Sequence, residues 1–245
     1  MNANYFACDA MLFDLDGVLI DSTSCVIRHW QRFADQHGLD LATIMQAAHG
    51  VRTIETIRLV APHLDAERET AEFTAREVQD TEGVYAIEGA RSLVDTLPED
   101  AWAVVTSGSA ALARTRLRAG GLPVPATLVT ANDVRQGKPA PEPYLVGAKR
   151  LGVAPGRCLV IEDAPAGIAS GKGAAMRVVG VASTHSRQKL LAAGADAVVD
   201  RLTDLTIRQG PTGYRLMVRL LQSRLDEPAV PADSALPPGV GKPAL

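Results

Sequence analysis

Cysteine is scarce in this sequence of 245 residues, which contains only Cys8, Cys25 and Cys158. The three are far apart and form no CxxC pair, which excludes a disulfide framework and a zinc ribbon. We expect all three to be reduced and structural. The five histidines form no HxH or HExxH pair, so the common zinc-enzyme arrangements are excluded as well. We expect His29 and His37 to be a pair on a helix surface.

The sequence also lacks an excess of one charge and a long hydrophobic run. The net charge is −3, and no basic stripe of the kind that binds nucleic acid is present. No segment reaches transmembrane length, and residues 1–6 lack the basic region that opens a signal peptide. We therefore expect a cytoplasmic monomer with a small-molecule partner and no nucleic-acid or membrane partner.

A glycine-rich segment at residues 167–173, GIASGKG, is superficially similar to a nucleotide-binding P-loop. Two required residues are missing from it. Ala166 stands at the first glycine position, and Gly173 stands where the loop needs serine or threonine. We exclude an NTPase for this reason.

An apolar run at residues 10–13 ends in two carboxylates, Asp14 and Asp16. Alternation along a strand places both on one side, and Gly17 lets the chain turn away. Two close carboxylates repel each other unless a cation such as Mg²⁺ neutralises them. An ionised carboxylate can attack phosphorus without a base, so Asp14 is the candidate nucleophile and Asp16 the candidate acid and base. The alternative is that one aspartate caps the following turn and the other is solvated.

The remaining pattern indicates helices inserted into an α/β domain. Residues 22–86 have helical periodicity and few strands. From residue 87 onward, helices alternate with short apolar strands, which predicts a parallel sheet that binds ligands at the carboxyl ends of its strands. The predicted helices of the insertion include residues 27–34, 41–48, 53–60 and 66–78, and the predicted strands are residues 101–106, 127–130, 158–161, 176–181 and 197–199.

Two further segments offer groups that bind phosphate. In VVTSGS, Ser107 and nearby backbone amides such as that of Gly108 can hold phosphate oxygens, whereas Ser109 is expected to be the helix N-cap. In GKPAPEP, the prolines restrict the backbone and so direct Lys138, whose ammonium would stabilise the Asp14 carboxylate and the transition state. The alternative for Lys138 is an ordinary surface lysine in a loop.

A third segment, CLVIED, is an apolar strand that ends in two acids. Asp163 can complete the ligands of a metal ion, with Glu162 behind it. Asp163 can instead cap the following helix, which begins near Pro165.

Together, FDLDG, VVTSGS, GKPAPEP and VIEDAPAG resemble the four ordered motifs of the haloacid dehalogenase-like hydrolases. The resemblance implies a Rossmann-like parallel-sheet core with a helical cap inserted after the first strand. It implies that Asp14 is nucleophile and metal ligand, and that Asp16 is acid and base and binds the metal through its backbone carbonyl. It further implies that Ser107 and Lys138 bind phosphate and that Asp163 binds Mg²⁺.

We expect three parts along the chain. Residues 1–21 and 87–222 form the core, and residues 22–86 form the helical cap. Residues 213–221 are expected to contain a last strand or helix. Residues 226–245 are rich in proline, alanine and glycine and are expected to form a disordered tail.

The choice of subgroup depends on a few positions. The dehalogenases lack an aspartate at the position of Asp16, so its presence implies phosphate chemistry. The β-phosphoglucomutases carry a histidine in the first cap helix where this sequence has Val26, which disfavours a mutase. The remaining sequence is similar to bacterial sugar phosphatases and to the related glycerol-phosphate and 2-deoxyglucose-phosphate phosphatases.

Substrate specificity is expected to reside in the cap. His49 and Arg52 lie near a loop between predicted cap helices, where polar groups can bind sugar hydroxyls. The alternative is a solvated helix start with an outward-facing arginine. We expect Glu55 and Arg58 to be a pair on the helix surface.

We therefore expect a Mg²⁺-dependent phosphatase that hydrolyses small phosphorylated sugars or polyols, such as hexose, hexitol or glycerol phosphates, through an aspartyl-phosphate intermediate. One alternative is a sugar phosphomutase of the β-phosphoglucomutase type. The other is a non-catalytic, phosphate-binding regulatory module.

Overall fold

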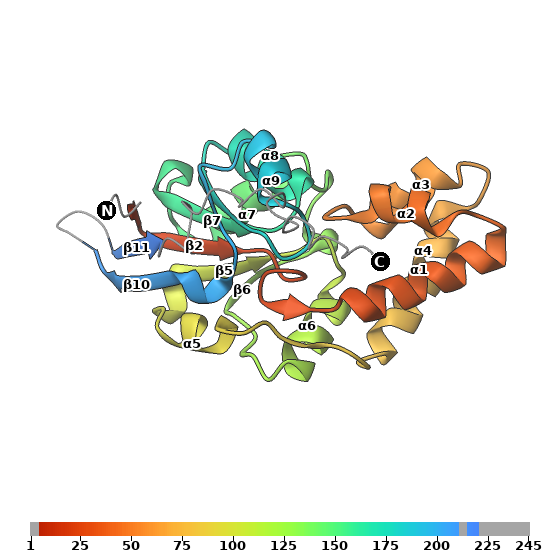
Figure 1. Ribbon diagram of the computed structural model, residues 1–245, viewed down its shortest axis with the longest axis horizontal. Coiled ribbons are helices and arrows are strands. Elements are labelled where there is room, and N and C mark those ends of the chain that lie inside the picture. Colours follow the sequence, from red (N-terminus) through yellow and green to blue (C-terminus); the bar gives the residue numbers. More distant parts are fainter. Residues whose placement is uncertain (1–4, 211–214, 221–245) are drawn as a thin grey trace, which may run out of the picture.

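A parallel β-sheet forms the centre of the computed structural model, which describes residues 5–210 and 215–220. The strand order is β6-β5-β2-β7-β8-β9 (Figure 1). Each neighbouring pair is parallel, which confirms the predicted α/β fold with a parallel sheet. The strands are β2 (Ala10–Phe13), β5 (Trp102–Val105), β6 (Thr127–Val129), β7 (Cys158–Glu162), β8 (Arg177–Val181) and β9 (Ala197–Val199).

Helices cover both faces of this sheet, because alternate residues of its buried strands point to opposite sides. Leu12 of β2 belongs to a cluster with Tyr144 and Ile168, on the face that lies uppermost in Figure 1. Phe13 belongs to the cluster of the other face, which includes Leu117. The upper helices are α7 (Glu142–Leu151), α8 (Pro165–Gly173) and α9 (Arg187–Ala192), and the lower ones are α5 (Ala90–Asp95) and α6 (Ala110–Ala119).

Helices α1 to α4 form a separate group beyond the carboxyl end of β2, at the right of Figure 1. They enter and leave through two short strands that pair antiparallel, β3 (Ile20–Asp21) and β4 (Tyr85–Ala86). We call α1 to α4 the four-helix segment. Its members are α1 (Thr23–His37), α2 (Leu41–Ala48), α3 (Thr53–Val60) and α4 (Ala66–Gln79), so the helices predicted over residues 41–48 and 53–60 have the expected ends.

A second antiparallel sheet, of order β1-β11-β10, was not predicted from the sequence. Its strands are β1 (Tyr5–Cys8), β10 (Leu205–Gln209) and β11 (Leu216–Leu220). Residues 213–221 were expected to contain a strand or a helix, and β11 is a strand. The predicted tail at residues 226–245, and the end of the predicted core after residue 220, lie outside the described residues. Within the described part of the chain, no helix is both long and apolar enough to cross a bilayer.

The prediction that His29 and His37 form a pair on a helix surface is wrong. His29 is buried, with its Nε2 2.9 Å from Asp80 Oδ2, and His37 Nε2 lies 3.2 Å from Glu69 Oε2. Glu69 lies within α4, and Asp80 is the C-cap residue of the same helix. Residues four apart share one face of a helix, so His29 and His37, which are two such steps apart, lie on the same face of α1. This face packs against α4 and does not face water.

The four-helix segment has an aromatic core of its own. The Trp30 ring lies 5.6 Å from the Phe33 ring and 4.4 Å from the Phe73 ring, measured between centroids. Phe33 is fully buried. Aromatic pairs of this kind stabilise a structure beyond the area that they bury.

We predict that Phe33→Ala lowers the free energy of unfolding by about 3–5 kcal/mol, because it removes a large buried side chain and leaves a cavity. Leu59→Ala is the matched control, since Leu59 is 71% exposed, and we expect a change within about 0.5 kcal/mol. Denaturant unfolding followed by circular dichroism measures both. Equal effects of the two substitutions would contradict the packing described here.

Candidate active site

Asp14 follows β2 directly, at the carboxyl end of a strand that lies between β5 and β7. Its backbone N–H donates to the carbonyl of Ile161 at 3.0 Å, which continues the pairing of β2 with β7. This register places Asp14 beside Glu162 and Asp163, where β7 ends. Asp14 is buried.

Lys138 connects these carboxylates. Its Nζ donates to Asp14 Oδ1 at 2.6 Å, to Glu162 Oε1 at 2.7 Å and to the Val105 carbonyl at 3.0 Å. An ammonium has three protons, so this set uses all of them. The side chain is 1% exposed, which rules out the surface-lysine alternative. Burial acts to lower the pKa of Lys138, but the charges of Asp14 and Glu162 outweigh this effect and hold it above its ordinary value.

Glu162 supports Lys138 and the start of α8. Tyr144 donates from its hydroxyl to Glu162 Oε1 at 3.0 Å. Glu162 Oε2 accepts from the backbone N–H groups of Asp163 and Ala164 at 2.9 and 3.1 Å. The N-cap residue of α8 is Ala164, so the capping alternative for Asp163 does not hold.

Carboxylate oxygens of Asp14, Glu162 and Asp163 all lie within 4.8 Å of one another. Three buried carboxylates face one lysine, so the group carries an excess of negative charge. Burial raises the pKa of Asp14, and it raises that of Asp163 with further contributions from Glu162 and Asp14. The Thr184 hydroxyl donates to Asp163 Oδ2. Oxygen donors with excess negative charge suit a hard divalent cation, so this group fits the expected Mg²⁺.

Gly17 is required for this arrangement. Its φ of +87° is unfavourable for other residues. A Cβ atom at this position would lie 2.1 Å from Asp163 Oδ2. The glycine of the first motif therefore allows the backbone to approach Asp163.

Asp16 lies near Asp14, and both line a cavity of about 120 Å³. Ser22 donates from its hydroxyl to Asp16 Oδ1 at 2.7 Å, and Arg116 Nη1 lies 2.8 Å from Asp16 Oδ2. Both oxygens of Asp16 therefore have a hydrogen-bond or ion-pair partner. Asp163 lines the same cavity.

The segment after β5 also reaches this cavity. Ser107 donates from its hydroxyl to the carbonyl of Gly50, in the loop between α2 and α3, at 2.8 Å. The N–H of Gly108 donates to Thr106 Oγ1 at 3.0 Å. Ser109 caps α6 by accepting from the N–H of Leu112 at 3.2 Å, as predicted.

The structure separates the two candidate specificity residues. His49 lines the cavity with Asp14 and Asp16, and its Nδ1 lies 2.6 Å from the Met45 carbonyl. Arg52 lines a neighbouring cavity of about 750 Å³, where it contacts Glu55 and the Arg135 carbonyl.

Glu55 and Arg58 do not pair with each other, which corrects the prediction for them. Glu55 accepts from Arg52, whereas Arg58 reaches Glu67 on α4. The packing of α3 against α4 gives Arg58 a nearer acid than the one on its own helix.

Arg116 and Glu77 are cavity residues that sequence reasoning missed. Both are buried, and Arg116 Nη2 donates to Glu77 Oε1 at 3.0 Å. Burial raises the pKa of Glu77 to about 7, against the effect of Arg116. A usable signal was their spacing, because Arg116 stands four residues after Leu112 and Glu77 four residues after Phe73, on the apolar faces of their helices.

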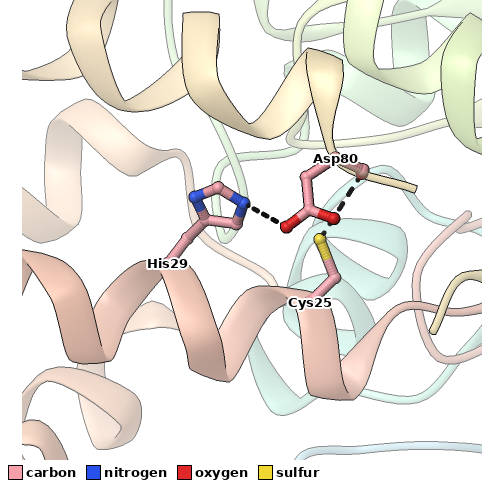
Figure 2. A group of neighbouring side chains, drawn as sticks. All are labelled: Cys25, His29 and Asp80. Carbon is pink, nitrogen blue, oxygen red and sulfur yellow. Dashed lines mark hydrogen bonds and ion pairs between the residues drawn. The ribbon is translucent and has the colours of Figure 1, made fainter. Parts of the chain in front are cut away.

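A second group with metal-type side chains lies in the four-helix segment. Figure 2 shows Cys25 and His29 on one helix, both facing Asp80. Arg28 donates to the same Asp80 oxygen that His29 contacts, from Nη2 at 2.7 Å, so the charge of this carboxylate is already balanced. We interpret the group as a connection between α1 and the end of α4. The cysteines at 8, 25 and 158 are free and buried, as expected.

Residues 11–181 match the haloacid dehalogenase-like hydrolase family. The chain belongs to this family. It is 40% identical over 211 residues to hexitol phosphatase A of Escherichia coli strain K12, which covers 84% of this chain and 97% of that relative. It is 37% identical to glycerol-1-phosphate phosphohydrolase 2 of Saccharomyces cerevisiae over 204 residues, or 78% and 81% of the two chains.

Solved structures show the same fold. A hydrolase from Pseudomonas syringae superimposes with a TM-score of 0.73 at 27% identity, covering 80% of this chain and 95% of that chain. The resemblance inferred from the four motifs is thereby confirmed for this haloacid dehalogenase-like hydrolase.

We predict that Mg²⁺ stabilises the protein, because it would offset the excess charge of the three carboxylates. At about 100 times its dissociation constant, a ligand of the folded state adds about 2.7 kcal/mol. Asp163→Asn should remove most of this gain, and it should not lower the thermal midpoint in the presence of a chelator, because a buried charge is lost. Thermal unfolding with chelator and with Mg²⁺ measures both effects.

Glu99→Gln is the control for this experiment, since Glu99 is exposed near the amino end of β5. It should leave the Mg²⁺ response as in the unchanged protein. An equal Mg²⁺ response in Asp163→Asn would place the cation elsewhere.

Proposed function

We propose that this hydrolase is a Mg²⁺-dependent phosphatase that acts on phosphate monoesters of small sugars or polyols. The observation that supports this most is the buried contact of 2.6 Å between Lys138 Nζ and Asp14 Oδ1 at the carboxyl ends of the sheet strands. A lysine in this position fixes the carboxylate and supplies positive charge where phosphate charge develops. Named relatives that act on hexitol and glycerol phosphates support the same substrate class.

The reaction follows from the placement of the two aspartates. Lys138 holds Asp14 Oδ1, which leaves Oδ2 to attack phosphorus. The bond from phosphorus to the sugar oxygen breaks, and Asp16 gives its proton to that oxygen. Water then attacks the phosphorus of the aspartyl phosphate and passes a proton to Asp16, which releases inorganic phosphate and restores Asp14.

Asp14, Asp163 and the backbone carbonyl of Asp16 are the proposed ligands of Mg²⁺. When bound, the ion would offset the negative charge of the phosphoryl group and of the carboxylates. Glu162 remains paired with Lys138 and Tyr144 and serves behind these ligands. Ser107 is the proposed hydrogen-bond donor to the substrate phosphate. For this role its hydroxyl must turn away from the Gly50 carbonyl.

We propose that residues 22–86 act as a cap that encloses the alcohol part of the substrate. The cavity beside Asp14 is lined on this side by apolar and polar groups together, among them Trp30, Phe73, His49 and Glu77. Apolar rings and hydrogen-bonding groups in a small space suit a sugar or polyol. His49 is the stronger specificity candidate, because Arg52 lines the neighbouring cavity.

A mutase is the less favoured function. Val26 lines the cavity near Asp16, and its side chain has no proton to exchange. We therefore expect water, and not a second sugar hydroxyl, to accept the phosphoryl group. Conversion of a sugar phosphate that depends on added bisphosphate would support the mutase instead.

We predict that the protein releases phosphate from hexitol, hexose or glycerol phosphates with Mg²⁺ and that a chelator stops the release. Asp14→Asn should lower kcat by about 10³-fold or more, because an amide is not nucleophilic. Asp95→Asn is a matched control, since Asp95 is exposed and lies on α5. Phosphate assays across the panel decide the point, and substantial turnover by Asp14→Asn would eliminate Asp14 as nucleophile.

A further inference from the structure

Arg116 joins the candidate acid and base to the four-helix segment. It lies on α6 and is 4% exposed. From this one guanidinium, Nη1 lies 2.8 Å from Asp16 Oδ2 and Nη2 donates to Glu77 Oε1 at 3.0 Å. Asp16 follows β2, whereas Glu77 stands in the last turn of α4. One buried cation is therefore shared by two acids from different parts of the fold.

Rigid, planar geometry makes arginine suited to such a bridge. A guanidinium presents its N–H groups in fixed directions, so binding Glu77 on one side restricts where it can hold Asp16 on the other. Ser22 holds the second oxygen of Asp16 at 2.7 Å. The Asp16 carboxylate thus cannot rotate without breaking one of these contacts.

Neither Arg116 nor Glu77 is replaceable at low cost. Arg116 and Glu77 are both almost completely buried, so removing either leaves the other as a buried charge with one partner fewer. The contact with Glu77 also requires α4 to lie against α6, as it does here. Movement of the four-helix segment away from α6 would break that contact and leave Arg116 paired with Asp16 alone.

We infer that Arg116 is a positioning residue for Asp16 and that Glu77 makes this positioning depend on the four-helix segment. Asp16 is then held at the leaving oxygen when α4 covers the cavity. This inference rests on the proposed phosphatase function. It assigns to Arg116 and Glu77 an effect on proton donation and not on phosphate binding, which Lys138 and Ser107 provide.

The leaving group distinguishes such a role from a merely structural one. An alkoxide leaving from glycerol phosphate or a hexitol phosphate is strongly basic and needs a proton from Asp16. The p-nitrophenolate ion is weakly basic and leaves without one. Loss of Asp16 positioning should therefore slow the alkyl ester far more than the aryl ester, whereas general damage to the site should slow both.

The experiment measures kcat and KM with glycerol 1-phosphate and with p-nitrophenyl phosphate in Mg²⁺. We expect Arg116→Met to lower kcat for the alkyl ester about 10²-fold or more and for the aryl ester about 10-fold or less, with KM changed little. Glu77→Gln should also lower kcat more for the alkyl ester than for the aryl ester, but both losses should be smaller. Arg116→Lys should retain more activity on the alkyl ester than Arg116→Met, because lysine keeps the positive charge but lacks the planar guanidinium that can donate to both acids.

Arg114→Met is the matched control, because Arg114 is an exposed arginine on the same helix. It should leave both reactions unchanged. If Arg116→Met fails to fold, Arg116→Lys and Glu77→Gln carry the comparison of the two esters. Equal losses on both esters in these variants, or no loss, would overturn the positioning role.

The outcome for the unchanged protein separates the two proposals. Hydrolysis of both esters by the unchanged protein, with equal losses in the variants, would refute the inference and leave the phosphatase intact. Absence of hydrolysis of any panel substrate by the unchanged protein would refute the phosphatase and the inference with it.

Discussion

Lys138 is the residue on which the rest of the site depends. Its ammonium is buried between Asp14 and Glu162, and a buried charge is costly unless it is fully paired. The ends of β2, β5 and β7 supply its three acceptors, so the pairing of these strands determines its environment. A shift in register would leave either the lysine or a carboxylate unpaired, which links the stability of the sheet to the chemistry at its edge.

The four-helix segment contacts the sheet domain through polar groups close to this edge. Ser107 donates to Gly50, Arg52 to the Arg135 carbonyl, and Arg116 to Glu77. Each of these contacts joins residues far apart in the sequence. Of these groups, Ser107 and Arg116 also line the cavity beside Asp14, as do their partners Gly50 and Glu77. Binding in the cavity and placement of the helices are therefore expected to influence each other.

The features that could be predicted from the sequence are those that a local sequence pattern determines. Asp14, Lys138 and Asp163 stand in short motifs, where an apolar strand or a proline-rich loop indicates both the local structure and the direction of the side chain. Helices α2 and α3 were predicted to the residue because their apolar spacing is regular. His29 was misplaced, because a histidine on a helix gives no indication of which face another helix will cover.

Arg116 and Glu77 could not be predicted as a pair, since 39 residues separate them and charged side chains on helices are usually solvated. The pairing of β1 with β11 was missed for a similar reason, because the residues that pair, such as Tyr5 and Arg219, are far apart in the sequence. Such contacts depend on how the whole chain folds, and no local pattern specifies them.

We propose that Asp14, held by Lys138, forms a covalent bond to phosphorus. The most direct measurement mixes Asp16→Asn, in which water attack should be slow, with p-nitrophenyl phosphate and Mg²⁺, followed by an acid quench and mass analysis of peptides. We expect one phosphoryl group on the peptide that contains Asp14, located on that residue. Release of p-nitrophenolate with no phosphoryl group on Asp14, or with the group on Asp163, would contradict it.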